Sequence, residues 1–478
     1  MARGSKDGTF GQCSSVLPNK ITTFHPLGDA SCGKVLLMPI KLEHTTERLT
    51  RRTGLALVNR FGDTIKLPSQ INRAFPVPGS NRGLLASDYV LTLVEMMIDG
   101  AVCLEDVRLF QNDDAYSALT EREGYPSSDA IGDWLRRHGG PDGERRLWTL
   151  MSNLLNTMTG GSGLTLDIDG TIIEADKGDA EMSYKGVRGY HPLLGACTEL
   201  GLFVGSRFQH GNAAPQQELV SFIQQCEKNV PGRFTTIRSD SAGYNSALIN
   251  DCVRCHRRFT ITADHDTAVM ERVRRISRNA WKQGRNPDGT ETDYHVAETV
   301  HTMDNTAEAF RLVLKRLRRS QQADLFDGNY HYWIVATNFS PNEKDAQAVL
   351  DFHNGRGEMP ACPPDRQRAG RTGRERLIGE LKHHYNLDHL PCGQFAANGL
   401  YFTIGLLAFT LVQLLKRHYF GDDWKRKSIR SLRYYWLHLP SRIVSHARYT
   451  IARVATSLST FQQLRAIYLQ LLLAPAPA

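Results

Sequence analysis

The sequence lacks any long run of apolar residues. Its longest run, GLYFTIGLLAFTLVQLL at 399–415, has 17 residues and includes two threonines and a glutamine. A helix that crosses a bilayer needs about 20 predominantly apolar residues. This run therefore predicts a buried core helix, and we expect no membrane partner. The first residues, MARGSKDGTFGQ, also lack the apolar stretch of a secretory signal peptide.

Cysteine is too sparse and too irregularly spaced for a disulfide framework. There are nine among 478 residues, which is an odd number, and this pattern is typical of a reducing compartment. The segment CVRCH at 252–256 matches a haem-attachment motif, but haem attachment requires export. A zinc site would need a second ligand pair, and no second C-x-x-C occurs. We predict a helix end with two buried thiols.

Positive charge exceeds negative charge only modestly. Lysine and arginine number 58 against 50 acidic residues, which gives a net charge of +8 and a pI near 9.0. This balance favours a polyanionic partner such as nucleic acid without requiring one. A hydrophobic content of 41% predicts a globular chain, long enough for two to four domains.

Helical and strand-like periodicities follow one another in an order that predicts an α/β fold. Residues 51–158 show mostly helical spacing, and TGGSGL from 159 indicates a turn or hinge. LTLDID, HPLLGACTE and LFVGSRFQHG follow as strands, and helices then alternate with RFTTIRSD and RFTITAD. Three antiparallel strands followed by alternating helices and strands fit a ribonuclease-H-like core with a mixed five-stranded sheet and flanking helices.

These patterns divide the chain into six predicted parts. The segment 266–328 is polar and rich in charge, so it is taken as an insertion into the core. The parts are a loosely ordered leader (1–50), a helical domain with basic ends (51–158), the first part of the core (159–265), the insertion domain (266–328), the second part of the core (329–418) and a basic helical C-terminal region (419–478).

The segment LTLDIDGTIIE at 164–174 places two aspartates at the end of an apolar strand. Two enzyme classes use such a segment. In a haloacid-dehalogenase-type phosphatase, Asp167 would be the nucleophile and Asp169 the general acid, with an acidic pair after a late strand. In a metal-dependent DNA transposase, the first metal-binding acid stands here. GDDW at 421–424 offers an acidic pair, but the residues before it are helical, which disfavours the phosphatase.

Two later acidic residues complete a possible metal-binding set. Asp240 ends the strand RFTTIRSD, and Glu380 lies in the helix RERLIGELKHHY, where it shares a face with Arg376 and His384. Two-metal cleavage of a phosphodiester needs clustered carboxylates that hold two cations about 3.5–4 Å apart. Oxygen ligands suit Mg²⁺ or Mn²⁺. Two strand ends and a helix form a rigid frame for such ligands.

The chain resembles the DDE transposases of bacterial insertion sequences, and in particular the group with a large insertion before the final glutamate. The resemblance runs over residues of about 50–415, and the order and spacing of the motifs carry it together. The motifs are LDIDGT, YKGVRGYHPLLG (184–195), RFQHGNAAP (207–215), IRSDSAGYN, YWIVATN and RERLIGELK, with CGQFAANGLYFTIGLLAFTL as the family's closing core helix.

The resemblance implies that Asp169, Asp240 and Glu380 are the catalytic acids and the ligands of two Mg²⁺ or Mn²⁺ ions. Asp167 remains a rival for the first acid, because residues two apart in a strand point to the same face. Asp169 is preferred because the family's first acid often stands two residues before a threonine, here Thr171.

The last predicted helix departs from the Tyr, Arg, Glu, Lys signature of related insertion-sequence enzymes. Arg376 and Glu380 fit its R-x-x-x-E part, but Gly373 stands at the Tyr position and Leu387 at the Lys position. This departure affects the phosphate contacts of the helix. Two nearby cations that can substitute are Lys382 and Arg374.

The resemblance further implies cut-and-paste transposition by a homodimer that binds double-stranded DNA at terminal inverted repeats and at a target, in the bacterial cytoplasm at the nucleoid. The helical domain 51–158 would then bind DNA. Trp281 is preferred to Trp333 as an aromatic that stacks on a flipped base, because Trp333 lies in a strand and is expected in the core. The expected DNA contacts are Arg376, Lys382, Arg374, Trp281, Arg274, Arg275, Arg318, Arg319, Lys425, Arg426 and Lys427, with Arg136, Arg137, Lys315 and Arg316 as further phosphate neutralisers.

Two alternatives stay open. A phosphatase acting through Asp167 would need neither Asp240 nor Glu380. A catalytically inactive, DNA-binding relative is disfavoured because all three acids are present. Imperfect inverted repeats just outside both ends of the gene would favour a mobile element.

Overall fold

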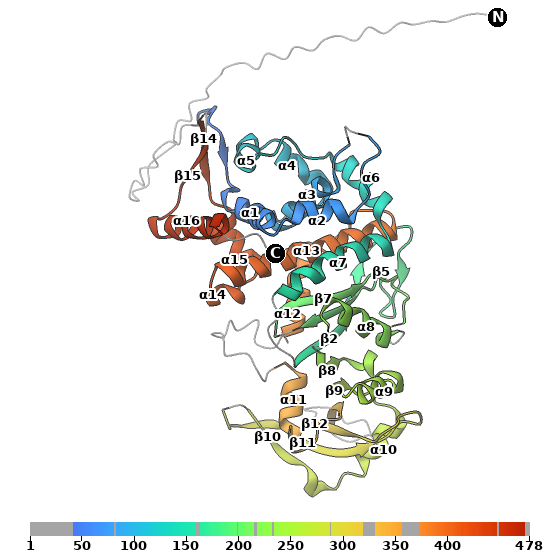
Figure 1. The fold of residues 1–478 in the computed structure, drawn as a ribbon. Coiled ribbons are helices and arrows are strands. Elements are labelled where there is room, and N and C mark those ends of the chain that lie inside the picture. The colour runs from blue at the N-terminus through green and yellow to red at the C-terminus, as the bar shows by residue number, and fades with distance from the viewer. Residues whose placement is uncertain are drawn as a thin grey trace, which may run out of the picture. The chain divides into compact units, whose positions relative to one another are not determined.

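The computed structural model describes residues 42–80, 83–157, 163–197, 199–214, 218–231, 234–286, 288–318, 330–355, 373–446 and 449–473, apart from the side chains of 157 and 373–375. Residues Glu47–Ala478 cluster as one compact unit, drawn in Figure 1. The predicted leader, 1–50, lies almost entirely outside the described residues. Its last two residues form the short strand β1 (Leu49–Thr50).

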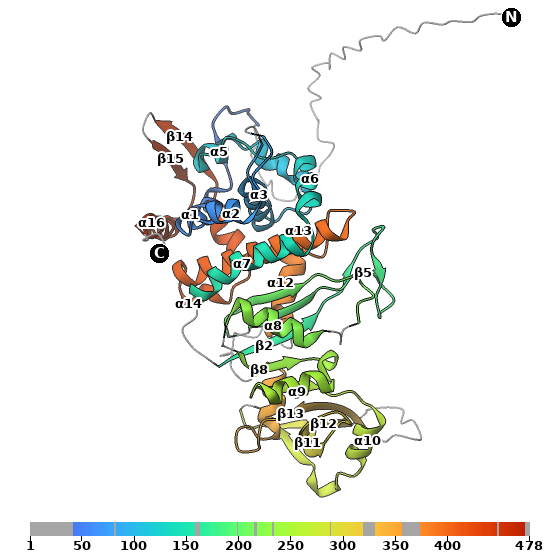
Figure 2. The ribbon, with the colours of Figure 1, turned by 45° about the vertical axis from the view of Figure 1, so that its right-hand side comes forward.

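A mixed five-stranded sheet forms the core of this unit (Figures 1 and 2). Its order is β7-β6-β2-β8-β9; β6 is antiparallel to β2 and β7, whereas β8 is parallel to β2 and β9. The predicted ribonuclease-H-like core is therefore confirmed. The elements are β2 (Leu164–Gly170), β6 (Leu193–Cys197), β7 (Leu202–Arg207), α8 (Leu219–Asn229), β8 (Phe234–Ser239), α9 (Ser246–Arg254) and β9 (Arg258–Thr262), with a small sheet of β3 (Ile173–Glu174), β5 (Arg188–Tyr190) and β4 (Glu181–Met182) between β2 and β6.

Four further strands widen this sheet, three from the predicted insertion (266–328) and one from the start of the predicted second part of the core (329–418). β13 (Tyr330–Thr337) pairs antiparallel with β9, and β12 (Phe310–Arg318), β11 (Glu291–His301) and β10 (Lys282–Arg285) follow outward, which makes nine strands in the described residues. α10 (Thr267–Arg274) packs on β11, and α11 (Ala346–His353) packs on β11, β12 and β13. Much of β11 and β13 is exposed or half-buried, which explains the polar composition of this segment.

The helix α13 (Phe395–Tyr419) organises the helical part of the unit. It contacts α1, α3, α6 and α7, and it also packs on β7 of the core sheet. Among the described helices it alone has the length and apolar composition of a membrane span, but 89% of its most apolar window is buried. The predicted core helix is therefore confirmed. The preceding helices are α1 (Ala56–Thr64), α2 (Leu67–Ala74), α3 (Ala86–Asp99), α4 (Arg108–Gln111), α5 (Asp114–Thr120), α6 (Ser128–His138) and α7 (Pro141–Thr157).

Glu144 of α7 makes the stability of this helix packing depend on pH. Its carboxylate lies against Gly399 of α13, and burial raises the pKa of Glu144 from 4.5 to about 7. The folded chain therefore keeps a proton that the unfolded chain releases, so the free energy of unfolding falls as the pH rises from 4.5 to 7. At about 1.4 kcal/mol per pKa unit, the loss is of the order of 3 kcal/mol.

We expect Glu144→Gln to remove this pH dependence. Thermal unfolding should show a higher midpoint for the variant than for wild type at pH 8, and similar midpoints at pH 5. Parallel curves of midpoint against pH for the two proteins would contradict this account of Glu144.

The C-terminal region differs from the helical tail that its composition predicts. The short helices α14 (Asp422–Lys425) and α15 (Ile429–Leu432) and a π-helix (Arg433–Leu437) are followed by a hairpin of β14 (Ser441–His446) and β15 (Tyr449–Val454), and then by α16 (Leu458–Leu473). The prediction of a helical region therefore holds in part, because a two-stranded hairpin lies among its helices. The third strand beside this hairpin is β1, near the other end of the sequence, through the pair Leu49 and Arg442. A local sequence window does not detect such pairing.

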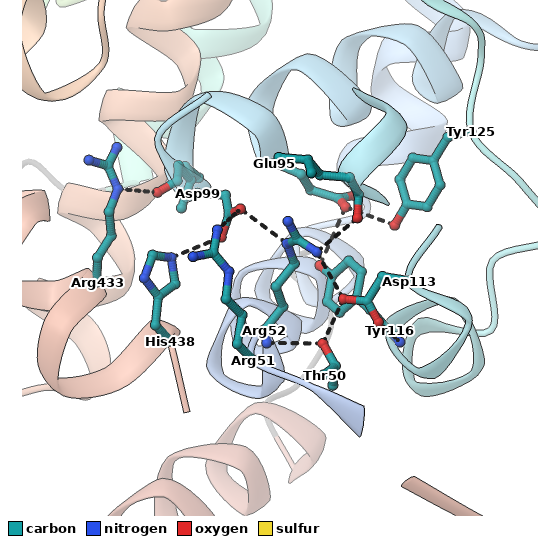
Figure 3. A network of polar contacts seen from close by, with 12 residues as sticks. Thr50, Arg51, Arg52, Glu95, Asp99, Asp113, Tyr116, Tyr125, Arg433 and His438 are labelled. Atoms are coloured by element: carbon teal, nitrogen blue, oxygen red, sulfur yellow. Dashed lines mark hydrogen bonds and ion pairs between the residues drawn. The ribbon is translucent and has the colours of Figure 1, made fainter. Parts of the chain in front are cut away.

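A buried network of charged side chains joins the β1 segment, α3 and the C-terminal segment (Figure 3). Arg52 lies 3.0 Å from Asp99 through Nε and 2.8 Å from Asp113 through Nη1. His438 Nε2 lies 2.9 Å from the second oxygen of Asp99. Burial alone would raise the pKa of Asp99, but the hydrogen bond with His438 and the charge of Arg52 lower it to about 2. The charged carboxylate thus ties two segments from opposite ends of the chain to α3.

Candidate active site

Asp169 and Asp240 line one cavity of about 250 Å³ at the edge of the core sheet. Asp169 lies at the end of β2, and Asp240 directly follows β8. These strands are parallel neighbours, and Ile168 of β2 lies opposite Ser239 of β8. Each of these two residues is followed by an aspartate. Asp169 therefore lies beside the end of β8, and Asp240 lies beside the end of β2. The cavity is lined further by Ile168, Gly170, Tyr184, His191, Leu193, Gln209, Ala214, Leu219, Ser239, Ser241 and Ala242.

Asp167, the rival first acid, forms a buried ion pair two residues before Asp169 in β2. It lies opposite Arg238 in the strand register, and Arg238 Nη2 donates to Asp167 Oδ2 at 2.8 Å while Nε donates to Oδ1. Asp167 is fully buried. The same guanidinium donates to the carbonyl of Phe352 in α11. This position gives Asp167 a structural role beneath the cavity and favours Asp169 as the first acid.

Asp240 is oriented by its own turn. Its Oδ1 accepts a hydrogen bond from the amide of Ala242 at 3.1 Å. Asp264 follows β9 and lies close enough to Asp240 to interact with its charge. Burial raises the pKa of Asp264 most, and the charges of Asp266 and Asp240 raise it further. Acidic residues therefore stand after all three parallel strands, and a divalent cation would offset their mutual repulsion.

His191 forms a wall of the cavity that sequence reasoning did not single out. Its amide donates to the carbonyl of Gln209 at 2.8 Å, and its ring packs on Gly170 so closely that a Cβ there would collide with Nε2. Burial lowers the pKa of His191, and a hydrogen bond to Ala213 opposes this effect. The signal in the sequence was the glycine that follows Asp169, together with the quoted motif YHPLLG.

Glu380, the predicted third acid, is not among the residues that line this cavity. It is buried on α12 (Gly373–His384), and its Oε1 accepts a hydrogen bond from the amide of Ile429, at the start of α15, at 2.7 Å. Burial lowers the pKa of Lys416 to about 8, and the charge of Glu380 opposes this effect. Glu380 therefore caps a helix and balances a buried cation. In the part of the chain that is described, no three His, Cys, Asp or Glu side chains form a metal-binding group.

Two of the three predicted phosphate contacts of α12 donate hydrogen bonds to the main chain, and their contact with DNA stays a prediction. Lys382 Nζ donates to the carbonyl of Ile172 at 2.8 Å, three residues beyond Asp169, so this side of α12 lies beside the end of β2. Arg376 Nη1 donates to the carbonyl of Arg426 at 2.9 Å. The side chain of Arg374 lies outside the described residues.

Two tryptophans were considered for base stacking: Trp281 directly precedes β10, and Trp333 lies in β13. Trp281 is half-buried and packs against the core, with Arg316 at 4.1 Å from its ring centroid. The expectation that Trp333 is a core residue was wrong, since its exposed fraction is 47%. In this part of β13, Trp333 shares the exposed face with His331, because successive residues of a strand point to opposite faces. Base stacking by Trp281 stays a prediction.

The other predicted DNA contacts lie mostly at the surface. Lys425 is 2.5 Å from Asp422, and Arg275 is 3.7 Å from Glu271. Their contact with DNA stays a prediction, and Arg319 lies outside the described residues. The exposed members of the predicted set are Arg274, Arg275, Arg318, Lys425, Arg426 and Lys427, with Arg136 and Arg137; Lys315 and Arg316 are half-buried.

The cavity fits a hard divalent cation. Asp169 and Asp240 offer carboxylate oxygens, which Mg²⁺ and Mn²⁺ prefer, and both come from rigid strand ends. A ribonuclease-H-like sheet with acidic residues at the ends of two adjacent parallel strands defines the class of metal-dependent nucleases and polynucleotidyl transferases.

Comparison with protein families identifies the group within this class. Residues 34–475 match the family model described as transposase DDE domain, group 1, so the chain belongs to this family and is a DDE-type transposase. Among solved structures, a piggyBac transposase synaptic complex with hairpin DNA is similar at 13% identity and a TM-score of 0.39, covering 82% of this chain and 81% of that one. This likeness is too distant to support further conclusions. No curated protein matches the sequence.

Proposed function

We propose that this transposase moves a bacterial insertion element by a cut-and-paste route. As a homodimer in the cytoplasm, it binds double-stranded DNA at terminal inverted repeats, cuts the strands at these ends and joins them to target DNA. The observation that supports this most directly is the shared position of Asp169 and Asp240 in one cavity. The basic net charge of +8 agrees with a DNA partner.

The fold holds the two carboxylates in position. Strand β2 positions Asp169, and the hydrogen bond from the amide of Ala242 orients Asp240. The buried ion pair of Asp167 and Arg238 links the two strands. Asp169 and Asp240 would hold divalent cations, which would supply activation of a water or a 3′-hydroxyl and stabilisation of the leaving oxygen. This arrangement requires a third carboxylate close to Asp169.

Helical geometry favours Glu375 over Glu380 as that third acid. Successive helical residues are about 100° apart, so Glu380 and Lys382 lie on opposite sides of α12. Lys382 contacts Ile172, near Asp169. In the sequence, Glu375 precedes Lys382 by seven residues, which is nearly two turns of an ideal helix. Arg371, Glu375 and Lys382 also fit the Arg, Glu and Lys spacing of the family signature, whereas a register on Glu380 places Leu387 at the Lys position.

Glutamine substitutions at the two positions should separate these roles. We expect Glu375→Gln to lose DNA strand cleavage and to keep the wild-type melting temperature. We expect Glu380→Gln to lower the melting temperature, because Lys416 loses its balancing charge, and to keep measurable cleavage at a temperature where it is folded. The measurements are a cleavage assay on an end duplex and thermal unfolding of both variants. Loss of cleavage by Glu380→Gln alone, at an unchanged melting temperature, would restore Glu380 as the third acid.

The phosphatase alternative does not agree with the geometry. A nucleophilic Asp167 would have to reach a substrate, but it is fully buried and bonded to Arg238. β6 also lies antiparallel beside β2, in a sheet order that fits a ribonuclease-H-like core. An inactive relative is distinguished only by assay.

Excision from a plasmid tests the proposed function. The plasmid would carry the DNA that flanks the gene at both ends, and the full chain would be incubated with it in Mg²⁺ or in EDTA. We expect Mg²⁺-dependent release of the segment between the ends and its insertion into a second plasmid. Binding to the ends without any strand cleavage in Mg²⁺ or Mn²⁺ would identify the chain as an inactive relative.

A further inference from the structure

Helices α2 and α7 border an open groove that is separate from the active-site cavity. Its volume is about 880 Å³. Leu150 and Leu154 of α7 are buried and form an apolar floor. The remaining lining residues are Ile65, Lys66, Ser69, Gln70, Arg73, Ala74, Arg146, Thr149 and Asn153.

The groove carries positive charge without acidic neighbours. Its charged lining residues are Lys66, Arg73 and Arg146, and no lining residue is acidic. None of the three cations forms an ion pair with a described residue. By contrast Arg145, the residue before Arg146 in α7, lies 2.6 Å from Asp142. The three cations therefore attract an anion that the chain itself does not supply.

One cation is held in place and two remain exposed. Arg146 donates from Nη1 to the carbonyl of Ala74, at the end of α2, which orients its guanidinium across the groove. Lys66 and Arg73 are exposed at the two ends of α2. This spacing suits a ligand with repeated negative charges better than a single small anion.

We infer that this groove binds the phosphate backbone of double-stranded DNA, an inference that rests on the proposed function. Gln70 and Asn153 in its lining carry amide groups, which commonly contact phosphate oxygens together with Lys and Arg. The hydroxyls of Ser69 and Thr149 donate to the carbonyls of Lys66 and Arg145. An acidic protein segment would meet the same charge. DNA is favoured because the groove is open and carries both cations and side-chain amides on its two sides, Gln70 on α2 and Asn153 on α7.

The groove is also rigidly joined to the catalytic sheet. Trp148 Nε1 of α7 donates to Ser206 Oγ of β7 at 3.0 Å, and Ser152 Oγ donates to the carbonyl of Asn229 at 2.9 Å. DNA held by the opposite side of α7 would therefore be positioned with respect to Asp169 and Asp240. Sequence reasoning did not find this surface, because its cations come from separate segments and form no basic run.

The test compares two double variants of the full chain that lose the same charge. Lys66→Gln with Arg73→Gln changes the groove, and Arg108→Gln with Arg145→Gln removes two exposed cations that do not line it. Fluorescence anisotropy would measure binding of a duplex with the element's end and of a scrambled duplex over a range of salt concentrations. Each lost phosphate contact lowers the slope of log affinity against log salt by about 0.9.

For the groove variant, we expect the slope of log affinity against log salt to be smaller in magnitude by about 2. Its affinity for both duplexes at 0.1 M salt should fall at least about tenfold, with an unchanged melting temperature. The control variant should lose much less. Equal losses in both variants, or unchanged DNA binding in the groove variant, would overturn the inference. If the groove variant instead loses binding to polyglutamate while DNA binding is kept, the groove is a site for an acidic protein. Failure of wild type to bind either duplex would contradict the proposed function itself.

Discussion

Asparagine at position 169 or 240 should abolish DNA strand cleavage and strand transfer while leaving the fold intact. Both carboxylates line the same cavity, and asparagine removes the negative charge that a divalent cation needs. Metal stabilisation of the transition state contributes several kcal/mol, and each 1.4 kcal/mol is a factor of ten. We therefore expect each variant to be slower by at least about a thousandfold.

The fold should tolerate these two substitutions. Asparagine has nearly the same shape as aspartate, and at position 240 it keeps an oxygen that accepts the hydrogen bond from Ala242. Rates of cleavage of an end duplex would be measured in Mg²⁺ and Mn²⁺, with thermal unfolding as the control for folding. A variant that is folded and cleaves at a rate within tenfold of wild type would remove its aspartate from the active site.

Alanine at position 167 should instead destabilise the whole catalytic sheet. It removes the acidic partner of Arg238 and leaves the charge of a buried guanidinium, which also donates to the carbonyl of Phe352 in α11. Removing one member of a buried ion pair costs about 3–5 kcal/mol, because the remaining charge stays out of water. We expect a loss of that size in the free energy of unfolding, measured by denaturant titration.

A matched double variant distinguishes the effect of an unpaired buried charge from the effect of lost packing. Asp167→Leu with Arg238→Met replaces the pair by apolar side chains, and such replacements are often neutral or stabilising. It should recover most of the stability that Asp167→Ala loses. Both proteins should cleave DNA when folded. A stable Asp167→Ala protein that cannot cleave would show that Asp167, and not Asp169, is the first acid.

The core of the fold is accessible to sequence reasoning because its signals are local. The aspartates at the ends of RFTTIRSD and LTLDID, and the apolar run at 399–415, each lie in one strand or helix whose pattern is complete within a few residues. Parallel pairing of neighbouring strands then brings the two strand ends together. The ribonuclease-H-like order of the sheet follows from these elements.

Features that depend on distant contacts were not accessible in the same way. The pairing of β1 with β14 joins the two ends of the chain, and the groove between α2 and α7 collects cations from separate segments. Helical spacing groups Glu380 with Arg376 and His384, but it does not reveal that α15 begins against Glu380 through Ile429. Asp167 and Asp169 have equivalent positions in the strand pattern, and it is the ion pair of Asp167 with Arg238 and the cavity beside Asp169 that distinguish them.

The most direct test of the central claim is binding of Mn²⁺ to the full chain in the presence of an end duplex, measured by titration calorimetry. The account predicts that wild type binds Mn²⁺, that Asp169→Asn and Asp240→Asn weaken this binding strongly, and that the double variant of Asp167 and Arg238 retains it. Unchanged Mn²⁺ binding in both single aspartate variants would contradict the account, because the cavity between β2 and β8 would then not be the metal site.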